Sequence, residues 1–298
     1  DDTTKKLAEE YGKEIWFSEG SSPMTYAQSV YRFDEGKSGL TGLNGVLDIA
    51  NRMITIVSGG YMTLYEYQPA VAGYYDGVTY CHKQLINACT PWNGYYTLDS
   101  GYYMNLHFSQ FMDKGWSFIF DACYGDAKVG GDGHALVDAK YSYITACSAE
   151  GDYSTIITNT TSEPITYNFE IANLAKADNE VYVWETRGPD EGQEYNANYF
   201  KKISTVTPEN GKYSVTIKPY SMITVSTLNI SEPKFDVPQE SDNKLLSLPY
   251  TDDFGYSDEF LASRGNAPLY TTDEGGAFEV AEKNGEKVLM QKITKDIK

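Results

Sequence analysis

The first third of the chain alternates between helical and strand periods of apolar residues. A helix is predicted over residues 3–11 and another over residues 43–57, where apolar side chains recur every three or four positions. Short apolar runs at residues 14–18 and 60–67 predict strands, and residues 104–112 predict a further helix. Helices and strands that alternate in this order are typical of parallel βα units, as in a TIM-type barrel.

The pattern changes near residue 115, after which the chain reads as one strand after another. Residues 136–147 and 165–171 alternate clearly between apolar and polar side chains, and turn signals such as Glu150-Gly151-Asp152 separate the runs. The sequence therefore predicts an antiparallel β-sandwich over about residues 115–228. Its other predicted strands are residues 116–120, 181–184, 213–217 and 222–228.

Four parts follow from these patterns. Residues 1–114 are predicted to be the C-terminal part of a barrel, and residues 115–230 a β-sandwich. Residues 231–248 are rich in Pro, Ser and charge and read as a linker, and residues 249–298 open a third β domain. Both ends look cut, because the chain opens on a helix start and stops inside a strand-like run.

The charge of the chain narrows its partners. It carries 24 Lys and Arg against 42 Asp and Glu, a net charge of −18. Such a surface repels phosphate backbones and anionic lipid, so neither nucleic acid nor an anionic membrane is an expected partner. No apolar run has membrane length, so no transmembrane segment is expected. The 26 tyrosines suit sandwich surfaces and sugar binding alike, so both uses stay open.

The cysteines give little guidance on chemistry. Cys81, Cys89, Cys123 and Cys147 form no CxxC pair, and the chain has only three histidines. A zinc ribbon, a redox motif and a His-rich metal site are therefore not expected. Disulfides and simple buried thiols both remain open.

The sharpest chemical signal is the run Ile15-Trp16-Phe17-Ser18-Glu19-Gly20, where a buried strand ends in a carboxylate. The carboxyl ends of barrel strands hold the catalytic groups of barrel enzymes. A Glu placed there can attack an anomeric carbon and form a glycosyl-enzyme intermediate. The residues alone also allow a second interpretation, in which Glu19 caps a loop or pairs with an Arg such as Arg32.

Five motifs in register carry a resemblance that covers nearly the whole chain. The sequence resembles glycoside hydrolase family 59, the galactocerebrosidase-like enzymes. The motifs are IWFSEG at 15–20, the stretch 60–75, PWNGYY at 91–96, QFMDKGW at 110–116 and YTDDF at 250–254.

The resemblance implies a fold and a mechanism. The fold is α/β plus all-β: the C-terminal half of a TIM (β/α)8 barrel, then the sandwich, then the start of a lectin-like β jelly roll. Glu19 is implied as the nucleophile of a retaining β-galactoside hydrolase that needs no organic cofactor. The acid/base Glu of the family lies upstream of Asp1, so the missing N-terminal part of the same enzyme is an expected partner. The location implied is secreted or extracellular, and lysosomal in a eukaryote.

Two departures from the family pattern keep the substrate open. Gln68, next to Tyr67, stands where the family places a Trp against the sugar, and no Arg occurs between Gly151 and Thr186 to bind it. These departures leave open whether the sugar is galactose and whether the aglycone is ceramide. The expected substrate is a carbohydrate or a glycolipid. Hydrolysis of another β-linked glycan, such as a β-1,6-galactan or a glucoside, is an alternative, and so is a non-catalytic carbohydrate-binding protein.

Further candidates are expected to bind substrate or metal. Tyr67, Gln68, Glu66 and Trp92 are substrate-binding candidates, although Trp92 could instead pack between barrel and sandwich, and Glu66 could be a satisfied interior carboxylate. The polar run 187–198 is either a loop over the barrel mouth or an ordinary surface loop. The family resemblance also implies a possible structural calcium ion that Asp253 would hold in part. The next ligand position expected from the family is Gly255, which offers no side-chain oxygen.

Overall fold

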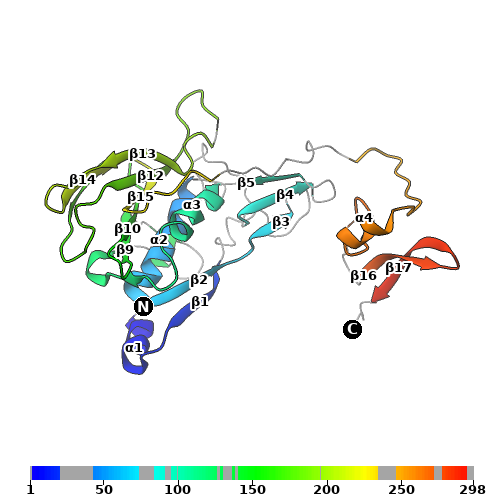
Figure 1. The fold of residues 1–298 in the computed structure, drawn as a ribbon, viewed down its shortest axis with the longest axis horizontal. Helices are drawn as coiled ribbons and strands as arrows, with labels where there is room; N and C mark the ends of the chain where they lie inside the picture. Colours follow the sequence, from blue (N-terminus) through cyan, green and yellow to red (C-terminus); the bar gives the residue numbers. More distant parts are fainter. Residues whose placement is uncertain are drawn as a thin grey trace. The chain divides into compact units, whose positions relative to one another are not determined.

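A computed structural model describes residues 2–20, 43–73, 84–90, 95–98, 100–125, 128–129, 136–137, 140–194, 196–233, 246–271 and 277–293 (Figure 1). The chain divides into two compact units. The first unit contains residues 1–87 and 98–236, and the second contains residues 88–97 and 237–298.

The first unit begins with a parallel strand–helix–strand arrangement. Helix α1 (Asp2–Tyr11) leads into strand β1 (Ile15–Gly20), and helix α2 (Leu43–Gly60) leads into strand β2 (Met62–Tyr67). Strands β1 and β2 pair in parallel and lie side by side in Figure 1. This pairing confirms the βα unit that the alternating pattern predicts.

Helix α2 buries its apolar face against the large sheet of the same unit. Its side chains form one cluster with Met104 of helix α3 (Ser100–Ser109) and with Ile144, Ile156 and Met222 of the sheet. Fully burying one such aliphatic side chain stabilises the fold by about 1.5–3 kcal/mol. Barrel-like helices and sheet thus share one core, and the predicted division at residue 114 stays a prediction.

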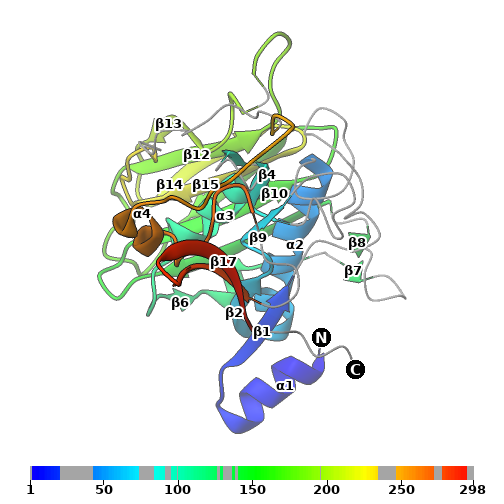
Figure 2. The same cartoon turned by 90° about the vertical axis from the view of Figure 1, so that its right-hand side faces the viewer.

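The large sheet has six strands in the order β13-β12-β15-β10-β9-β6, paired antiparallel. Figure 2 shows α2 and α3 near it from a second side. Its strands are β6 (Ser117–Phe118), β9 (Tyr141–Cys147), β10 (Tyr153–Asn159), β12 (Val181–Arg187), β13 (Lys201–Val206) and β15 (Ser221–Ser226).

A two-stranded antiparallel sheet covers the other face of the large sheet. Strands β11 (Ile165–Glu170) and β14 (Lys212–Ile217) pair with each other. Their inward residues join those of the large sheet in a second apolar cluster, which includes Tyr153, Val183 and Val215. The antiparallel pairing expected for this region is confirmed, and the central strand β10 of the large sheet is buried on both faces.

Burial on both faces explains a strand that the sequence pattern missed. Strand β10 is buried at every position, so it shows no alternation of apolar and polar residues. Its hydroxyls are satisfied inside the sheet, because Ser154 bonds to Ser226 at 2.7 Å and Thr155 to Thr145 at 2.9 Å. Buried polar groups are tolerated when they are paired in this way.

Other elements differ from prediction at their ends. Strand β13 was not predicted because it is almost wholly exposed. The predicted strand 136–147 is divided into β8 (Leu136–Val137) and β9, and helix α3 begins four residues before the predicted start. The remaining short elements are β3 (Val71–Gly73), β4 (Ile86–Thr90), β5 (Tyr95–Leu98), the 3-10 turn η3 (Phe120–Ala122) and β7 (Lys128–Val129).

The second unit holds helix α4 (Asp258–Ser263) and the antiparallel hairpin of β16 (Ala277–Lys283) and β17 (Glu286–Ile293). The Ser257 hydroxyl caps α4 by accepting the Phe260 N–H at 3.1 Å. Most of the predicted linker lies outside the described residues. Among the described helices, none combines the length and the apolar character needed to cross a bilayer.

Two of the four cysteines can be assigned. Cys123 and Cys147 are free thiols, and Cys123 donates to the carbonyl of Ile119 at 3.2 Å. Burial raises the pKa of the Cys123 thiol, which makes it a poor nucleophile. Cys81 and the side chain of Cys89 lie outside the described residues.

Candidate active site

Glu19 is exposed at the carboxyl end of β1, as the sequence predicts for a catalytic carboxylate. An irregularity in the strand pairing places it there. Phe17 is opposite Tyr65 and Gly20 is opposite Tyr67, so β1 carries one more residue than β2 over this interval. An extra residue of this kind is a β-bulge, and bulges commonly re-aim a side chain.

The pairing around the bulge indicates which face Glu19 occupies. The rings of Phe17 and Tyr65 stack at 5.1 Å with an interplanar angle of 5°, on the side that packs against α2. Gly20 faces the same Tyr65, three positions after Phe17 rather than two. Since neighbouring residues point to opposite faces, Glu19 points away from α2.

Glu66 shares this exposed face with Glu19. It alternates with Tyr65 and Tyr67, which pack against the α2 cluster, and its own side chain is exposed. The ladder continues beyond it, because the Gln68 N–H donates to the Gly20 carbonyl at 2.7 Å. The carboxyl ends of both strands therefore present two carboxylates and the exposed Gln68 at one edge.

Tyr65 is a supporting residue that the sequence analysis did not single out. Its ring lies directly over the α-carbon of Gly20 and stacks on Tyr67 with centroids 6.5 Å apart. Burial raises the pKa of its hydroxyl, and the Arg52 guanidinium opposes that shift. The hydroxyl is buried without a hydrogen-bond partner among the described residues. Tyrosines two apart in a predicted strand were the available signal, because such residues share a face.

Trp16 is the large apolar side chain on the exposed face of β1. It is 56% exposed, and its indole N–H donates to the Glu14 carboxylate at 3.2 Å. An exposed Trp beside strand-end carboxylates is a surface on which a sugar ring or further protein can pack.

Other sequence candidates fall elsewhere. Trp92 and Arg32 lie outside the described residues. Asp253 belongs to the second unit, where its carboxylate accepts the Gly255 N–H at 2.9 Å. Within the described ranges no group of three or more His, Cys, Asp and Glu is placed to hold a metal. The calcium possibility therefore gains no support from these residues.

The polar run that starts at Arg187 is tied down at its base. The Arg187 guanidinium contacts Glu185 at 2.9 Å and both carboxylate oxygens of Asp190 at 2.7 Å. These bonds raise the pKa of Arg187 and lower the pKa of Asp190. Whether the loop reaches over a barrel mouth stays a prediction.

Solved structures resemble this chain in fold. The chain is similar to a solved arabinose-bound GH51 α-L-arabinofuranosidase, with a TM-score of 0.50 at 12% identity, covering 72% of this chain and 32% of that chain. A GH30 subfamily 8 xylanase from Clostridium acetobutylicum gives a TM-score of 0.47 at 17% identity, covering 74% of this chain and 44% of that chain. The chain shares its fold with part of a glycoside hydrolase.

Sequence comparison supports the same family that the motifs indicate. Residues 1–110 match the sequence profile of "Glycosyl hydrolase family 59". This confirms the resemblance that the five motifs carry. The chain is 25% identical to galactocerebrosidase of Danio rerio over 224 residues, covering 70% of this chain and 31% of that protein. It is 24% identical to the Homo sapiens protein over 238 residues, covering 74% and 32% respectively. The chain thus spans about a third of the length of these curated relatives.

Proposed function

We propose that this chain is the nucleophile-bearing part of a retaining glycosidase that cleaves a β-galactoside, as the names of its relatives suggest. One observation carries the proposal: Glu19 is exposed at the carboxyl end of a parallel strand, inside the segment that matches family 59. A carboxylate in that position can attack the anomeric carbon while the leaving group departs, which gives a covalent glycosyl-enzyme ester.

The neighbours of Glu19 receive supporting roles. Glu66 accepts hydrogen bonds from sugar hydroxyls, and Gln68 on the same edge both accepts and donates them. Tyr67 packs against the α2 cluster and supports this edge from the other face. Trp92 lies outside the described residues, and a role in stacking on the sugar is proposed for it from the sequence alone. A retaining enzyme needs a second carboxyl about 5–5.5 Å from the nucleophile. We assign that acid/base role to a Glu outside this chain, on the remainder of the same enzyme, and we propose a secreted or lysosomal location.

The domain plan belongs to the same proposal. Residues 1–114 form the C-terminal part of a (β/α)8 barrel, residues 115–230 a β-sandwich, and residues 249–298 the start of a lectin-like domain after a linker. The parallel β1–α2–β2 unit and the antiparallel sheets support this plan.

The direct test is covalent trapping with an activated 2-deoxy-2-fluoro galactoside. Such a reagent carries a leaving group that departs without a strong general acid, so the acid/base residue is not required. We expect a mass increase of one sugar on the peptide that contains Glu19. Glu19→Gln should abolish the label, whereas Glu9→Gln should keep it, because Glu9 is an exposed carboxylate on helix α1 and not at a strand end.

The other outcomes separate the alternatives. Labelling by the gluco reagent but not by the galacto reagent keeps the mechanism and replaces the substrate with another β-linked glycan. Labelling that survives in Glu19→Gln overturns the assignment of the nucleophile. The absence of label from both reagents, in the presence of the remainder of the enzyme, favours a non-catalytic carbohydrate-binding protein.

A further inference from the structure

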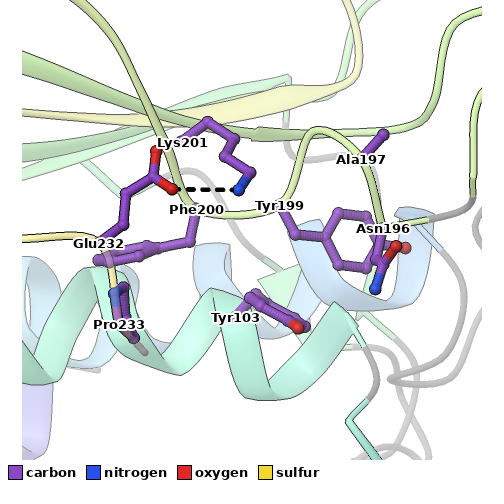
Figure 3. A pocket seen from close by; sticks show the side chains of 8 residues that line it. All are labelled: Tyr103, Asn196, Ala197, Tyr199, Phe200, Lys201, Glu232 and Pro233. Atoms are coloured by element: carbon purple, nitrogen blue, oxygen red, sulfur yellow. Dashed lines mark hydrogen bonds and ion pairs between the residues drawn. The ribbon is translucent and has the colours of Figure 1, made fainter. Parts of the chain in front are cut away.

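A pocket lies beside helix α3 (Figure 3). Its other walls are the segment that leads into β13 and the segment that follows β15. We call it the α3–β13 pocket. Its volume is about 260 Å3, and none of its described lining residues comes from β1 or β2. The lining consists of Tyr103, Asn196, Ala197, Tyr199, Phe200, Lys201, Glu232 and Pro233.

The back wall of the pocket is held in a strained conformation. Phe200 has a φ of 50°, in the left-handed region that bulky residues rarely adopt. Its N–H donates to the Thr186 hydroxyl at 2.9 Å, and that hydroxyl also bonds to His107 Nε2 at 2.8 Å. The ring packs on buried Trp184 with centroids 4.9 Å apart. Backbone strain that the surrounding structure enforces is common at ligand-binding sites. The contacts of Phe200 hold the back wall of the pocket in place before any ligand binds.

Tyr103 supplies ring surface because it is partly exposed, whereas Tyr199 is only 2% exposed and packs behind it. Tyr103 from α3 and Tyr199 from the loop meet edge to face with centroids 5.1 Å apart. Figure 3 shows them on the same side of the pocket, near Asn196, while Pro233 lies on the opposite side. The apolar face of Tyr103 suits the CH surface of a sugar ring.

The polar groups favour a ligand without charge. Lys201 Nζ and Glu232 Oε2 form an ion pair at 3.2 Å, so one positive and one negative charge cancel at the rim. The Asn196 amide adds two donors and one acceptor. Donors and acceptors placed side by side match neighbouring hydroxyls, each of which donates and accepts.

The size of the pocket sets the length of the ligand. Pockets for drug-sized ligands have roughly 300–1,000 Å3, and this one is slightly smaller. We propose that the α3–β13 pocket binds a single neutral pyranose ring of a glycan. The proposal is independent of the catalytic role of Glu19, because it holds equally for an enzyme and for a carbohydrate-binding protein.

Saturation-transfer NMR on the whole chain tests this. The probes are methyl β-D-galactopyranoside, methyl β-D-glucopyranoside and methyl β-D-xylopyranoside, with D-glucuronate as the charged comparison. We expect transfer from the protein to at least one neutral glycoside and weaker transfer to glucuronate. Asn196→Ala, which removes the amide, and Tyr103→Ala, which removes the ring face, should each weaken binding by about three- to tenfold, the effect of one lost hydrogen bond or one lost aromatic contact.

The controls separate this pocket from the edge that carries Glu19. Asn179→Ala, at an exposed position outside the pocket, should leave the affinity unchanged. The proposal is overturned if no neutral glycoside receives saturation, or if both pocket variants bind as wild type does. It is also overturned if Glu19→Gln removes the signal, because the sugar would then occupy the catalytic edge. The covalent trapping of Glu19 does not depend on any of these results.

Discussion

Gly20 is a position where a neighbouring ring requires the absence of a side chain. A Cβ built at Gly20 would clash with Cζ and Oη of Tyr65, whose ring is wedged between Phe17, Tyr67 and the α2 core. The ring cannot move far, since it is stacked on both sides. The residue next to the proposed nucleophile is therefore fixed by packing.

We predict that Gly20→Ala destabilises the chain by about 1–3 kcal/mol, the usual effect of overpacking. Urea unfolding measures this. Gly59→Ala in helix α2 is the matched control: nothing lies within 4 Å of its built Cβ, so it should be neutral or stabilising by up to about 1 kcal/mol. Equal free energies of unfolding for the two variants would contradict the close packing of Tyr65 on Gly20.

A second prediction at this scale concerns the Tyr65 hydroxyl. Because the buried oxygen has no partner among the described residues, Tyr65→Phe removes an unsatisfied polar group. We expect the free energy of unfolding to rise or stay within about 0.5 kcal/mol of wild type. A loss above about 1.5 kcal/mol in urea unfolding would show that the hydroxyl has a partner in solution.

For single residues, the sequence predicted where Glu19 lies along its strand but not which face its side chain occupies. It placed Glu19 at a strand end, because an apolar run stops there and loop residues follow. It could not place the bulge, because one extra residue in a ladder leaves no mark in composition or period. Tyr65 was missed for a related reason: its role depends on a glycine that lies close only after β1 and β2 pair.

At the scale of elements, one buried histidine connects a helix to the large sheet. His107 on α3 bonds through Nδ1 to Thr224 of β15 and through Nε2 to Thr186 of β12, each at 2.8 Å. Complete burial lowers the pKa of His107 from 6.5 to about 3. The folded chain therefore holds the ring neutral, while the unfolded chain protonates it below about pH 6.5.

The sign of the pH effect follows from that difference. Below the pKa that His107 has in the unfolded chain, the unfolded state binds one more proton than the folded state. The free energy of unfolding therefore decreases as the pH is lowered, until the folded pKa near 3 is reached. The slope from this group approaches about 1.4 kcal/mol per pH unit. We predict that His107→Gln lacks this part of the slope between pH 6 and pH 4 in urea unfolding. Carboxylates contribute equally to both proteins, so identical slopes would contradict the prediction.

The sequence pattern predicted helices and strands well where one face is more exposed to solvent than the other. It predicted them poorly where both faces are buried or both are exposed. Helix α2 and strand β11 follow their patterns closely, because each has one side that is more buried than the other. Strand β10 is buried throughout, and β13 is exposed at all but its last position, so neither shows a period of two. Periodicity reports a boundary between core and solvent, and these strands have none.

At the scale of the whole molecule, the charge of −18 is the dominant long-range feature. Like charges repel more strongly in the compact state than in the expanded chain. The Debye length falls from about 30 Å at 0.01 M salt to about 10 Å at 0.1 M. We predict that Tm rises as NaCl increases over this range. Sucrose at matched osmolality serves as the uncharged control, and a constant or falling Tm in NaCl would contradict the prediction.

The two units also limited what the sequence could predict. A contiguous four-part division is the simplest interpretation of a linear pattern, but residues 88–97 group with residues 237–298 in the compact units. Helix α2 meanwhile shares its core with Ile144 and Met222, which are about a hundred or more positions further along. Long-range packing of this kind has no local signature.

The extra residue in β1 acts as a phase shift within the chain. Before it, odd-numbered residues such as Phe17 face helix α2; after it, the even-numbered Gly20 does. Deleting Ser18 would leave Glu19 as the single residue between the pairs at Tyr65 and Tyr67, directly opposite Glu66 on the exposed face. The carboxylate would keep its face, but two acidic side chains would then stand in register, where like charges repel. Loss of one small serine should therefore weaken catalysis by changing the direction of Glu19, although every catalytic side chain would still be present.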